Sequence, residues 1–273
     1  MIYYRMKVQC NWVHFKLSGT LMHKTSLFSV IIFLLLGSKI FAADPEALGL
    51  VEKAFDYWRG MSSYSEFSMT IHRPDFERTM ILKGWTRGRG DALFFVQQPP
   101  KDAGNGSLKK GKEMWSYNPK INRAIKLPPS MMSQSWMGSD FSNDDLAKSD
   151  SILEDYDHII VDKSVDDGHE IFTVESVAKE DAPVVWGKQI LKIRDDFILL
   201  NEKFYDEDMV LVKEMTAENI DDFSGRIFPR SWTMRRADEE DRFTRLEYVT
   251  LEFDIEIEDK MFTLASLKSK KRL

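Results

Sequence analysis

The sequence has few of the residues on which disulfide-bonded, metal-binding or membrane-spanning folds depend. It has one cysteine, Cys10, and five histidines among 273 residues, and no apolar run reaches the roughly 20 residues that cross a bilayer. Basic residues number 38 against 44 acidic ones, which argues against a dedicated nucleic-acid binder. An aromatic fraction of 12% argues against disorder, because these side chains can fill a large core.

The first 42 residues differ in charge from the rest of the chain. They hold five of the basic residues and no Asp or Glu, which leaves 33 basic and 44 acidic residues, a net charge of −11, over 43–273. The stretch from Met22 to Ala43 has the three-part pattern of a secretory signal. It begins with a basic stretch at Met22–Lys24, continues with an apolar run over 26–37 and ends in small residues at the expected cleavage site. We therefore expect export, with cleavage after Ala42 or Ala43.

Residues 1–21 precede this signal, and two explanations stay open. Either translation starts at Met22, or 1–21 is a cytoplasmic extension. Cleavage at the predicted site removes Cys10, so the mature chain would have no thiol for a disulfide, a metal or a nucleophile, and no cysteine for lipid attachment. The predicted organisation is an extension with a signal peptide over 1–42 and one domain over 43–273.

The mature chain begins with a helix signal. Asp44-Pro45-Glu46 supplies a capping carboxylate, a proline for the first turn and an acid near the positive end of the helix dipole, and Gly60 is placed to end the helix. Apolar residues at spacings of three and four make one buried stripe: Leu48, Val51, Phe55 and Trp58. The pattern predicts one amphipathic helix of about four turns.

After Gly60 the apolar period changes to two, which indicates strands with short turns between them. The segments that read as strands are 67–71, 79–86, 92–97, 113–117, 123–127, 158–165, 169–177, 188–193, 198–205, 209–216, 230–236 and 243–257. We expect about ten to eleven strands in an antiparallel meander that must close or be capped, because open edges invite aggregation. The fold class is therefore mainly β.

The segment 128–155 interrupts this pattern. Nearly thirty residues without strand periodicity are uncommon inside a compact domain and are usually functional or a lid. Ser142 and Asp145 frame a short helix start, as in a capping box. The methionines and aromatics over 130–141 suit contact with a variable apolar partner, and the alternative is that they plug one end of a barrel.

Catalytic signals are weak. His72, His158 and His169 have no metal-ligand spacing, and no nucleophile elbow, P-loop or dinucleotide motif is present. Adjacent acidic pairs could serve acid–base chemistry but fall mostly in predicted turns, where Asp is favoured by its own backbone hydrogen bonds; they are Asp144-Asp145, Asp166-Asp167, Asp195-Asp196, Asp221-Asp222 and Glu239-Glu240. We expect a non-enzymatic protein without metal or cofactor.

Several motifs carry a family resemblance. They are Arg59-Gly60-Met61, Met69-Thr70-Ile71, the Trp-Ser-Tyr-Asn-Pro stretch within 112–119, the Gly-Ser-Asp-Phe stretch within 137–146, and 261–267 at the end. With these motifs the mature chain resembles the LolA-like, outer-membrane lipoprotein-sorting family of periplasmic proteins. The resemblance implies a half-open antiparallel β-barrel that is closed by helices and loops around an apolar interior.

The resemblance also suggests which residues hold a ligand. The predicted lipid-binding cavity residues are Phe67, Met69, Ile71, Trp85, Leu93, Phe95, Trp115 and Tyr117. The predicted lid residues are Met131, Met132, Trp136, Met137 and Phe141, and the family motif is Gly138, Ser139 and Asp140. A carrier must keep its cavity under a displaceable lid, because a closed apolar core has already gained the free energy of burial from its own side chains.

The predicted function is a periplasmic carrier of the acyl chains of lipoprotein or lipid, which takes cargo from an inner-membrane exporter towards an outer-membrane acceptor and acts as a monomer. Two alternatives stay open: a cargo-free adaptor subunit of a resistance-nodulation-division exporter, and an envelope hydrolase that uses an acidic pair. The basic runs 109–112 and 268–272 could contact anionic headgroups or an acidic partner, although solvated lysines also explain them.

Overall fold

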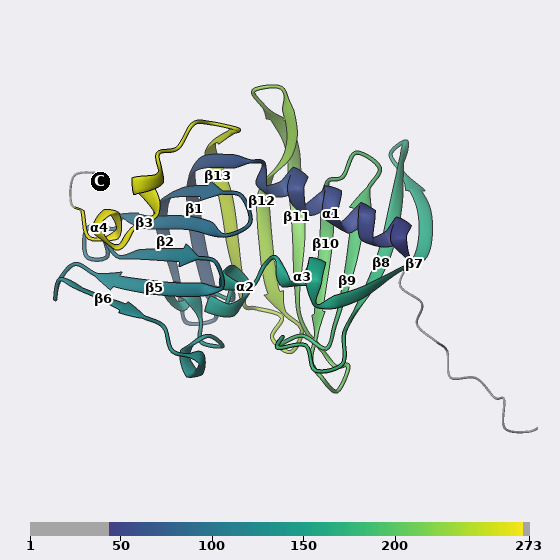
Figure 1. Ribbon diagram of the computed structural model, residues 1–273, viewed down its shortest axis with the longest axis horizontal. Helices are drawn as coiled ribbons and strands as arrows, with labels where there is room; N and C mark the ends of the chain where they lie inside the picture. The colour runs from purple at the N-terminus through teal and green to yellow at the C-terminus, as the bar shows by residue number, and fades with distance from the viewer. Residues whose placement is uncertain (1–43, 270–273) are drawn as a thin grey trace, which may run out of the picture. The chain divides into compact units, whose positions relative to one another are not determined.

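Thirteen strands form one antiparallel sheet in the computed structural model, which describes residues 44–269 (Figure 1). The strands are β1 (Ser62–Arg73), β2 (Phe76–Arg87), β3 (Asp91–Gln98), β4 (Gly106–Lys110), β5 (Glu113–Asn118), β6 (Arg123–Lys126), β7 (Tyr156–Asp166), β8 (His169–Ala178), β9 (Lys188–Arg194), β10 (Leu199–Tyr205), β11 (Leu211–Phe223), β12 (Arg226–Arg236) and β13 (Phe243–Phe253). The helices are α1 (Pro45–Arg59), α2 (Asn143–Ala147), α3 (Ser151–Glu154) and α4 (Leu264–Leu267), with short 3-10 turns η1 (Pro129–Met131), η2 (Trp136–Gly138) and η3 (Asp259–Phe262). The predicted signal peptide and upstream extension lie outside the described residues.

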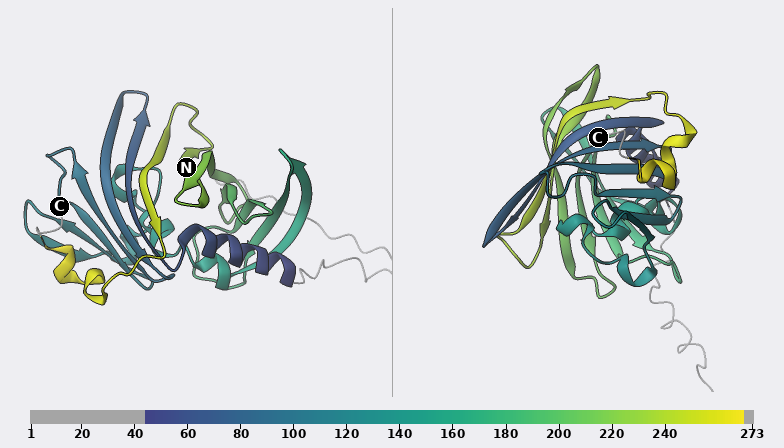
Figure 2. Two further views of the ribbon diagram at one scale, coloured as in Figure 1. Left: turned by 90° about the horizontal axis from the view of Figure 1, so that it is seen from above. Right: turned by 90° about the vertical axis from the view of Figure 1, so that its left-hand side faces the viewer.

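The sheet consists of two meanders joined at one pair of strands. The strand order is β6-β5-β4-β3-β2-β1-β13-β12-β11-β10-β9-β8-β7, so β1 to β6 run outward in one direction and β13 to β7 in the other. The junction is the antiparallel pairing of β1 with β13, with Ser63 opposite Phe253 and His72 opposite Phe243. The sheet curves strongly but does not close, because the edge strands β6 and β7 pair with one neighbour each (Figure 2).

The strand count corrects the expectation of ten to eleven. Among residues 44–269 the sequence pattern located twelve of the thirteen strands and missed β4, whose sequence Gly-Ser-Leu-Lys-Lys has a single apolar residue, Leu108. All five residues of β4 pair with β3, and all five pair with β5. A short strand between two partners is stabilised by its ladders on both sides, so its own side chains need not alternate in polarity.

Helix α1 confirms the predicted caps. The Asp44 carboxylate accepts a hydrogen bond from the Glu46 N–H at 2.9 Å, and Gly60, with a left-handed φ of 65°, donates its N–H to the Asp56 carbonyl at 2.8 Å. The buried face of the helix comprises Ala47, Leu50, Val51, Ala54 and Phe55. Figure 1 shows α1, α2 and α3 together in front of the same face of the sheet.

The chain connection between the two edge strands explains where the segment 128–155 lies. Because β6 and β7 stand at opposite ends of the sheet, the chain must cross one face to pass from one to the other. The crossing segment contains η1, η2, α2 and α3. The predicted capping box is confirmed: the Ser142 side chain accepts from the Asp145 N–H, and the Asp145 side chain accepts from the Ser142 N–H.

The opposite face of β3, β4 and β5 is covered by the C-terminal segment. Phe262 of η3 and Leu267 of α4 pack with Leu93, Phe95 and Leu108 in a cluster separate from the main core. This part of the sheet is therefore buried on both faces. None of the helices among residues 44–269 has the length and apolar character needed to cross a lipid bilayer.

Candidate functional site

An apolar cavity of about 240 Å³ lies between the sheet, α1 and the crossing segment. Its wall takes residues from α1, from strands of both meanders and from the crossing segment. The apolar lining residues are Val51, Ala54, Phe55, Trp58, Phe67, Ala92, Phe94, Met114, Trp136, Phe141, Leu146, Ile152, Tyr156, Val184, Val185, Trp186, Leu191, Leu199, Phe204, Met215, Phe228, Trp232, Met234, Leu246, Tyr248, Leu251 and Phe253. The cavity is thus bounded by the two halves of the sheet together.

Aromatic rings form a connected part of this wall. Trp232 meets Trp58 of α1 edge-on, with 6.3 Å between the ring centroids, and meets Phe228 at 6.4 Å. On the other meander, Phe94 lies 5.5 Å from Trp136 of the crossing segment. Rigid rings hold a cavity open better than flexible aliphatic chains do, because they have few rotamers with which to collapse into the space.

The structure places only part of the predicted cavity set at this cavity. Phe67 lines it, and Met69 and Ile71 lie in the same core cluster without reaching the cavity surface. For the remaining five residues the predicted position is wrong, because they lie on the opposite face of the sheet, with η3 and α4. These residues are Trp85, Leu93, Phe95, Trp115 and Tyr117. Their immediate neighbours Phe94 and Met114 line the cavity instead.

The physical reason is that β3 is buried on both faces. In Asp91–Gln98, Ala92 and Leu93 are both buried, and so are Phe95 and Val96, so alternation of polarity does not identify the inward face. Sequence analysis also placed the cavity in the first meander alone. The second half of the wall could have been predicted from Trp232 and Met234. They alternate within a segment that the sequence predicted as a strand, and both line the cavity.

Two of the five predicted lid residues line this cavity, and the other three lie nearby on the core cluster. Trp136 and Phe141 are buried, at 4% and 9% exposure, and line the cavity. Met131, Met132 and Met137 are half-buried and pack against the core from outside. The Trp136 indole N–H donates to the Ser107 hydroxyl at 2.9 Å, which fixes the ring against β4.

The Gly-Ser-Asp motif attaches the crossing segment to the sheet. Met137 and Gly138 both have left-handed φ values, 53° and 83°, which turn the chain sharply after Trp136. The Ser139 hydroxyl, fully buried, donates to the Trp136 carbonyl at 2.7 Å and accepts from the Phe141 N–H at 3.2 Å. Asp140, whose side chain has no solvent exposure, carries the ion pairs that tie this turn to the sheet.

Ionisable side chains gather at two places on the cavity wall. At the first, Arg59 ends α1 and Lys109 stands on β4, where its ammonium group lies 3.0 Å from Asp150 Oδ1. Burial lowers the pKa of Arg59 and of Lys109, while the Asp150 charge opposes the shift at both groups. Burial favours the neutral form of a base because a buried charge loses hydration.

At the second place, Asp145 of α2 holds together three elements. It caps its own helix, accepts from the Trp186 indole N–H at 3.2 Å and forms an ion pair with the buried Lys213 of β11. Glu202 of β10 lies beside this group on the cavity wall. Burial raises the pKa of Glu202 to about 8, and the Asp145 charge adds to the rise while Lys213 opposes it.

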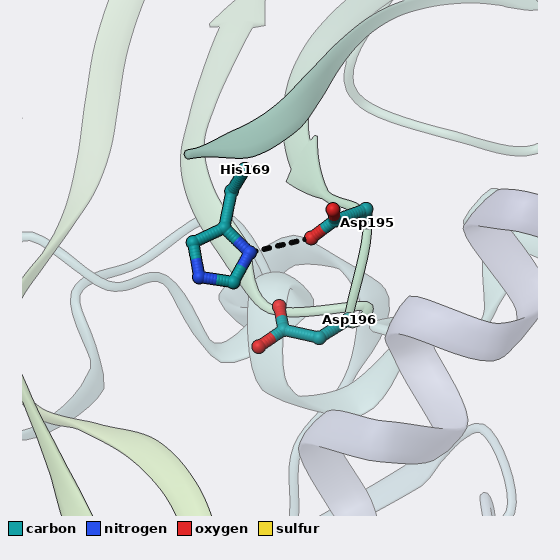
Figure 3. Close-up of side chains that lie close together, drawn as sticks. All are labelled: His169, Asp195 and Asp196. Atoms are coloured by element: carbon teal, nitrogen blue, oxygen red, sulfur yellow. Dashed lines mark hydrogen bonds and ion pairs between the residues drawn. The ribbon is translucent and has the colours of Figure 1, made fainter. Parts of the chain in front are cut away.

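The acidic pair Asp195-Asp196, which follows β9, is engaged by residues of β8 and β9. Figure 3 shows His169 Nδ1 donating to Asp195 Oδ1, a contact of 2.7 Å, with Asp196 beside them. These three side chains are close enough to share an ion, but Asp196 already accepts two hydrogen bonds from Arg194, at 2.8 and 2.6 Å. The hydrogen bond from His169 lowers the pKa of Asp195. Both carboxylates of the pair are therefore engaged by neighbouring side chains, Asp195 by His169 at the start of β8 and Asp196 by Arg194 at the end of β9.

Solved structures with the same fold are available for comparison. A domain described as an outer membrane lipoprotein-sorting protein from Vibrio parahaemolyticus superposes with a TM-score of 0.71 at 19% identity, over 82% of this chain and 99% of that one. A DUF1329 family protein from Desulfovibrio piger gives 0.73 at 23% identity, over 81% and 98%. A LolA superfamily protein from Nitrosomonas europaea gives 0.66 at 22% identity, over 80% and 97%.

These similarities establish the fold class, that of the LolA-like proteins, as the resemblance of the motifs implied. A family model described as an uncharacterized protein matches residues 88–269, about two thirds of the chain, and the chain belongs to that family. No curated protein sequence matches the chain significantly.

Proposed function

We propose that this protein is a periplasmic carrier that binds the acyl chains of a lipoprotein or a lipid in the cavity between the two meanders. The observation that carries the proposal is a partly open apolar cavity with aromatic walls beneath an anchored cover. Each methylene that moves from water into such a space contributes about 0.8 kcal/mol, so an acyl chain gains a large free energy on entry. Two of the similar structures support it, since one is described as a lipoprotein-sorting domain and the other as a LolA superfamily protein.

The half-buried methionines Met131, Met132 and Met137 are the movable part of the cover in this proposal. Met side chains are unbranched and polarizable, so they can repack against ligands of different length. Trp136 and Phe141 reach the cavity itself and would shift with the ligand, while Asp140 keeps the base of the lid attached to the sheet. An inner-membrane exporter would supply the cargo and an outer-membrane acceptor would take it, with no chemical step on the way.

Native mass spectrometry tests this proposal. The mature chain is purified without detergent from the periplasm of an exporting host, and we expect a mass excess that lipid extraction identifies as an acylated species. Leu246→Trp should abolish that excess, because Leu246 lines the cavity and the larger ring would fill it. Val249→Trp is the matched control, because Val249 lies on the same strand at 65% exposure.

The outcomes separate the candidates. Lipid retained by wild type and Val249→Trp but lost from a folded Leu246→Trp supports the carrier. A protein that emerges without lipid and takes up none when phospholipid vesicles or an acylated peptide are offered contradicts it, and favours the adaptor subunit. Melting temperatures of all three proteins show whether the loss of lipid comes from unfolding.

A further inference from the structure

The cavity has a polar strip on its sheet wall. The strand registers place Ser63 opposite Thr86, Thr86 opposite Ala92 and Ala92 opposite Lys109, in one row across four strands. All four side chains line the cavity. Direct cross-strand partners have Cβ atoms about 4.5–5.5 Å apart, so this row brings two hydroxyls and an ammonium group onto one face. The Ser63 and Thr86 hydroxyls are hydrogen-bonded to each other at 2.7 Å.

The next row adds a hydroxyl without a partner. Ser65 stands opposite Gly84, and the Phe94 ring packs over this glycine, 2.7 Å from where a Cβ at Gly84 would lie. Ser65 is 7% exposed and lines the cavity, and its hydroxyl makes no hydrogen bond to any residue of the described range 44–269. Because this hydroxyl lies on the cavity surface and donates to no group of the described residues, a ligand atom in the cavity can accept its hydrogen bond.

Arg59, the last residue of α1, also lines the cavity. Its Nε donates to the Gly88 carbonyl at 2.8 Å and its Nη2 reaches the Asp91 carbonyl at 3.4 Å, so the guanidinium lies against the turn between β2 and β3. Within residues 44–269 no carboxylate pairs with it. The guanidinium has five N–H donors, and these two contacts leave others directed elsewhere.

The charges around the strip do not cancel. Lys109 pairs with Asp150, but the nearby Asp91 carboxylate is already held by Arg87 at 2.8 Å and by Lys110 at 3.4 Å. Two cations, Arg59 and Lys109, therefore face the cavity with one carboxylate between them, a local charge of +1. A buried positive charge of this kind is stabilised by a bound anion, since hydrogen bonds to charged groups are about twice as strong as neutral ones.

We propose that Arg59, Lys109 and Ser65 form a binding site for the anionic headgroup, a carboxylate or a phosphate, of an amphiphile whose acyl chain occupies the apolar part of the cavity. This inference rests on the proposed function and specifies its cargo as an anionic one. The headgroup would lie under the C-terminal end of α1, and the chain would run along the aromatic wall towards Phe228 and Trp232. Lys109 belongs to the basic run 109–112, which could have consisted of solvated lysines. Instead, Lys109 is 3% exposed and faces the cavity.

The test compares three ligands that share a palmitoyl chain: palmitate, palmitoyl lysophosphatidate and the uncharged monopalmitoylglycerol, each below its micelle concentration at pH 7.5. Isothermal titration calorimetry on delipidated protein should show at least one anionic ligand binding about tenfold or more tightly than the uncharged one. Preference for palmitate alone assigns the site to a carboxylate, and preference for lysophosphatidate alone assigns it to a phosphate.

Two variants test the residues. Arg59→Met removes the cation that no carboxylate of the described residues pairs with and leaves the Lys109–Asp150 ion pair intact, so the local charge falls from +1 to zero; it should reduce the preference for the anion about tenfold while the affinity for monopalmitoylglycerol stays unchanged. Ser65→Ala, which breaks no internal hydrogen bond, should lower only the anion affinity, by a few-fold. Lys148→Met is the matched control, since Lys148 also lines the cavity but is paired with Asp144 at 3.0 Å.

Equal binding of the three ligands by wild type would overturn the anion site and leave the carrier proposal standing. A preference that persists in both variants, or that Lys148→Met removes equally, would also overturn it. No binding of any palmitoyl ligand would instead reject the carrier proposal itself.

Discussion

The Asp140 carboxylate accepts hydrogen bonds from both terminal nitrogens of Arg73, at 3.0 and 3.1 Å, with no solvent exposure of its own. Arg242 adds a third contact at 3.0 Å and the Thr244 hydroxyl a fourth at 2.7 Å. Arg73 is the last residue of β1 and Thr244 the second residue of β13, so one aspartate connects the crossing segment to the junction of the two meanders.

Asp140→Asn should therefore loosen the lid and lower stability. Breaking one partner of a buried pair leaves the arginines without their acceptor, and typically costs about 3–5 kcal/mol. Urea unfolding measures the loss, and chymotrypsin should cut faster near Trp136 or Phe141. The control is Asp238→Asn, which removes an exposed partner of Arg236. It should change neither the free energy of unfolding nor the rate of chymotrypsin cleavage much. Equal effects of the two substitutions would show that Asp140 is not an anchor.

The pH dependence of stability should reveal Glu202. Burial raises the pKa of Glu202 to about 8, above its ordinary value of 4.5, with the charge of Asp145 adding to the rise. Between these pH values the unfolded chain releases a proton that the folded chain keeps, so this contribution to stability is complete below about pH 4.5 and is lost as the pH rises to about 8.

Glu202→Gln has no such proton to lose. We expect its urea-unfolding free energy to be flatter over this window and to exceed that of the wild type at pH 8 by roughly 2–4 kcal/mol. The difference should shrink at pH 5. A variant that is less stable than wild type at pH 8 would mean that Glu202 is ionised and well paired at that pH.

Lys213 should be important for the attachment of α2 to the second meander. Its ammonium group is paired with Asp145 and lies 4.8 Å from the Trp186 ring, and the side chain is 6% exposed. Lys213→Met leaves Asp145 buried without its cation and should cost about 3–5 kcal/mol in thermal or urea unfolding. Lys203→Met is the matched control, because Lys203 lies 3.7 Å from Glu214 with about a third of its side chain exposed. A comparable loss in both variants would contradict this role.

Two glycine substitutions should act in opposite directions. A Cβ at Gly106 would lie 2.8 Å from the Phe95 ring and 3.0 Å from Leu267, so Gly106→Ala should destabilise the cover formed by α4 by about 1–3 kcal/mol. Gly49, inside α1, has nothing within 4 Å of such a Cβ, so Gly49→Ala should stabilise the helix by about 0.5–1 kcal/mol. Circular dichroism melts measure both. A neutral Gly106→Ala would show that α4 docks loosely.

Sequence alone identified the local features of this protein. The caps of α1 at Asp44 and Gly60, the capping box at Ser142 and most strands follow from side chains acting within a few residues of each other. The motif 138–140 was found as a pattern, without its role, because the partners of Asp140 lie 67 to 104 positions away along the chain.

The cavity was decided by tertiary structure. The pairing of β1 with β13 brings Phe67 beside Tyr248, and only then do the two meanders share one wall. The inward face of β3 was set by which side received the lid and which received α4, and both sides of that strand are apolar. Lys109 reads in sequence as one lysine of an exposed run, and it becomes a cavity residue because its strand register points it inward. The periodicity of a strand indicates that it is buried. Which of its faces meets a cavity depends on the elements that pack against each face, and these elements come from residues distant in sequence.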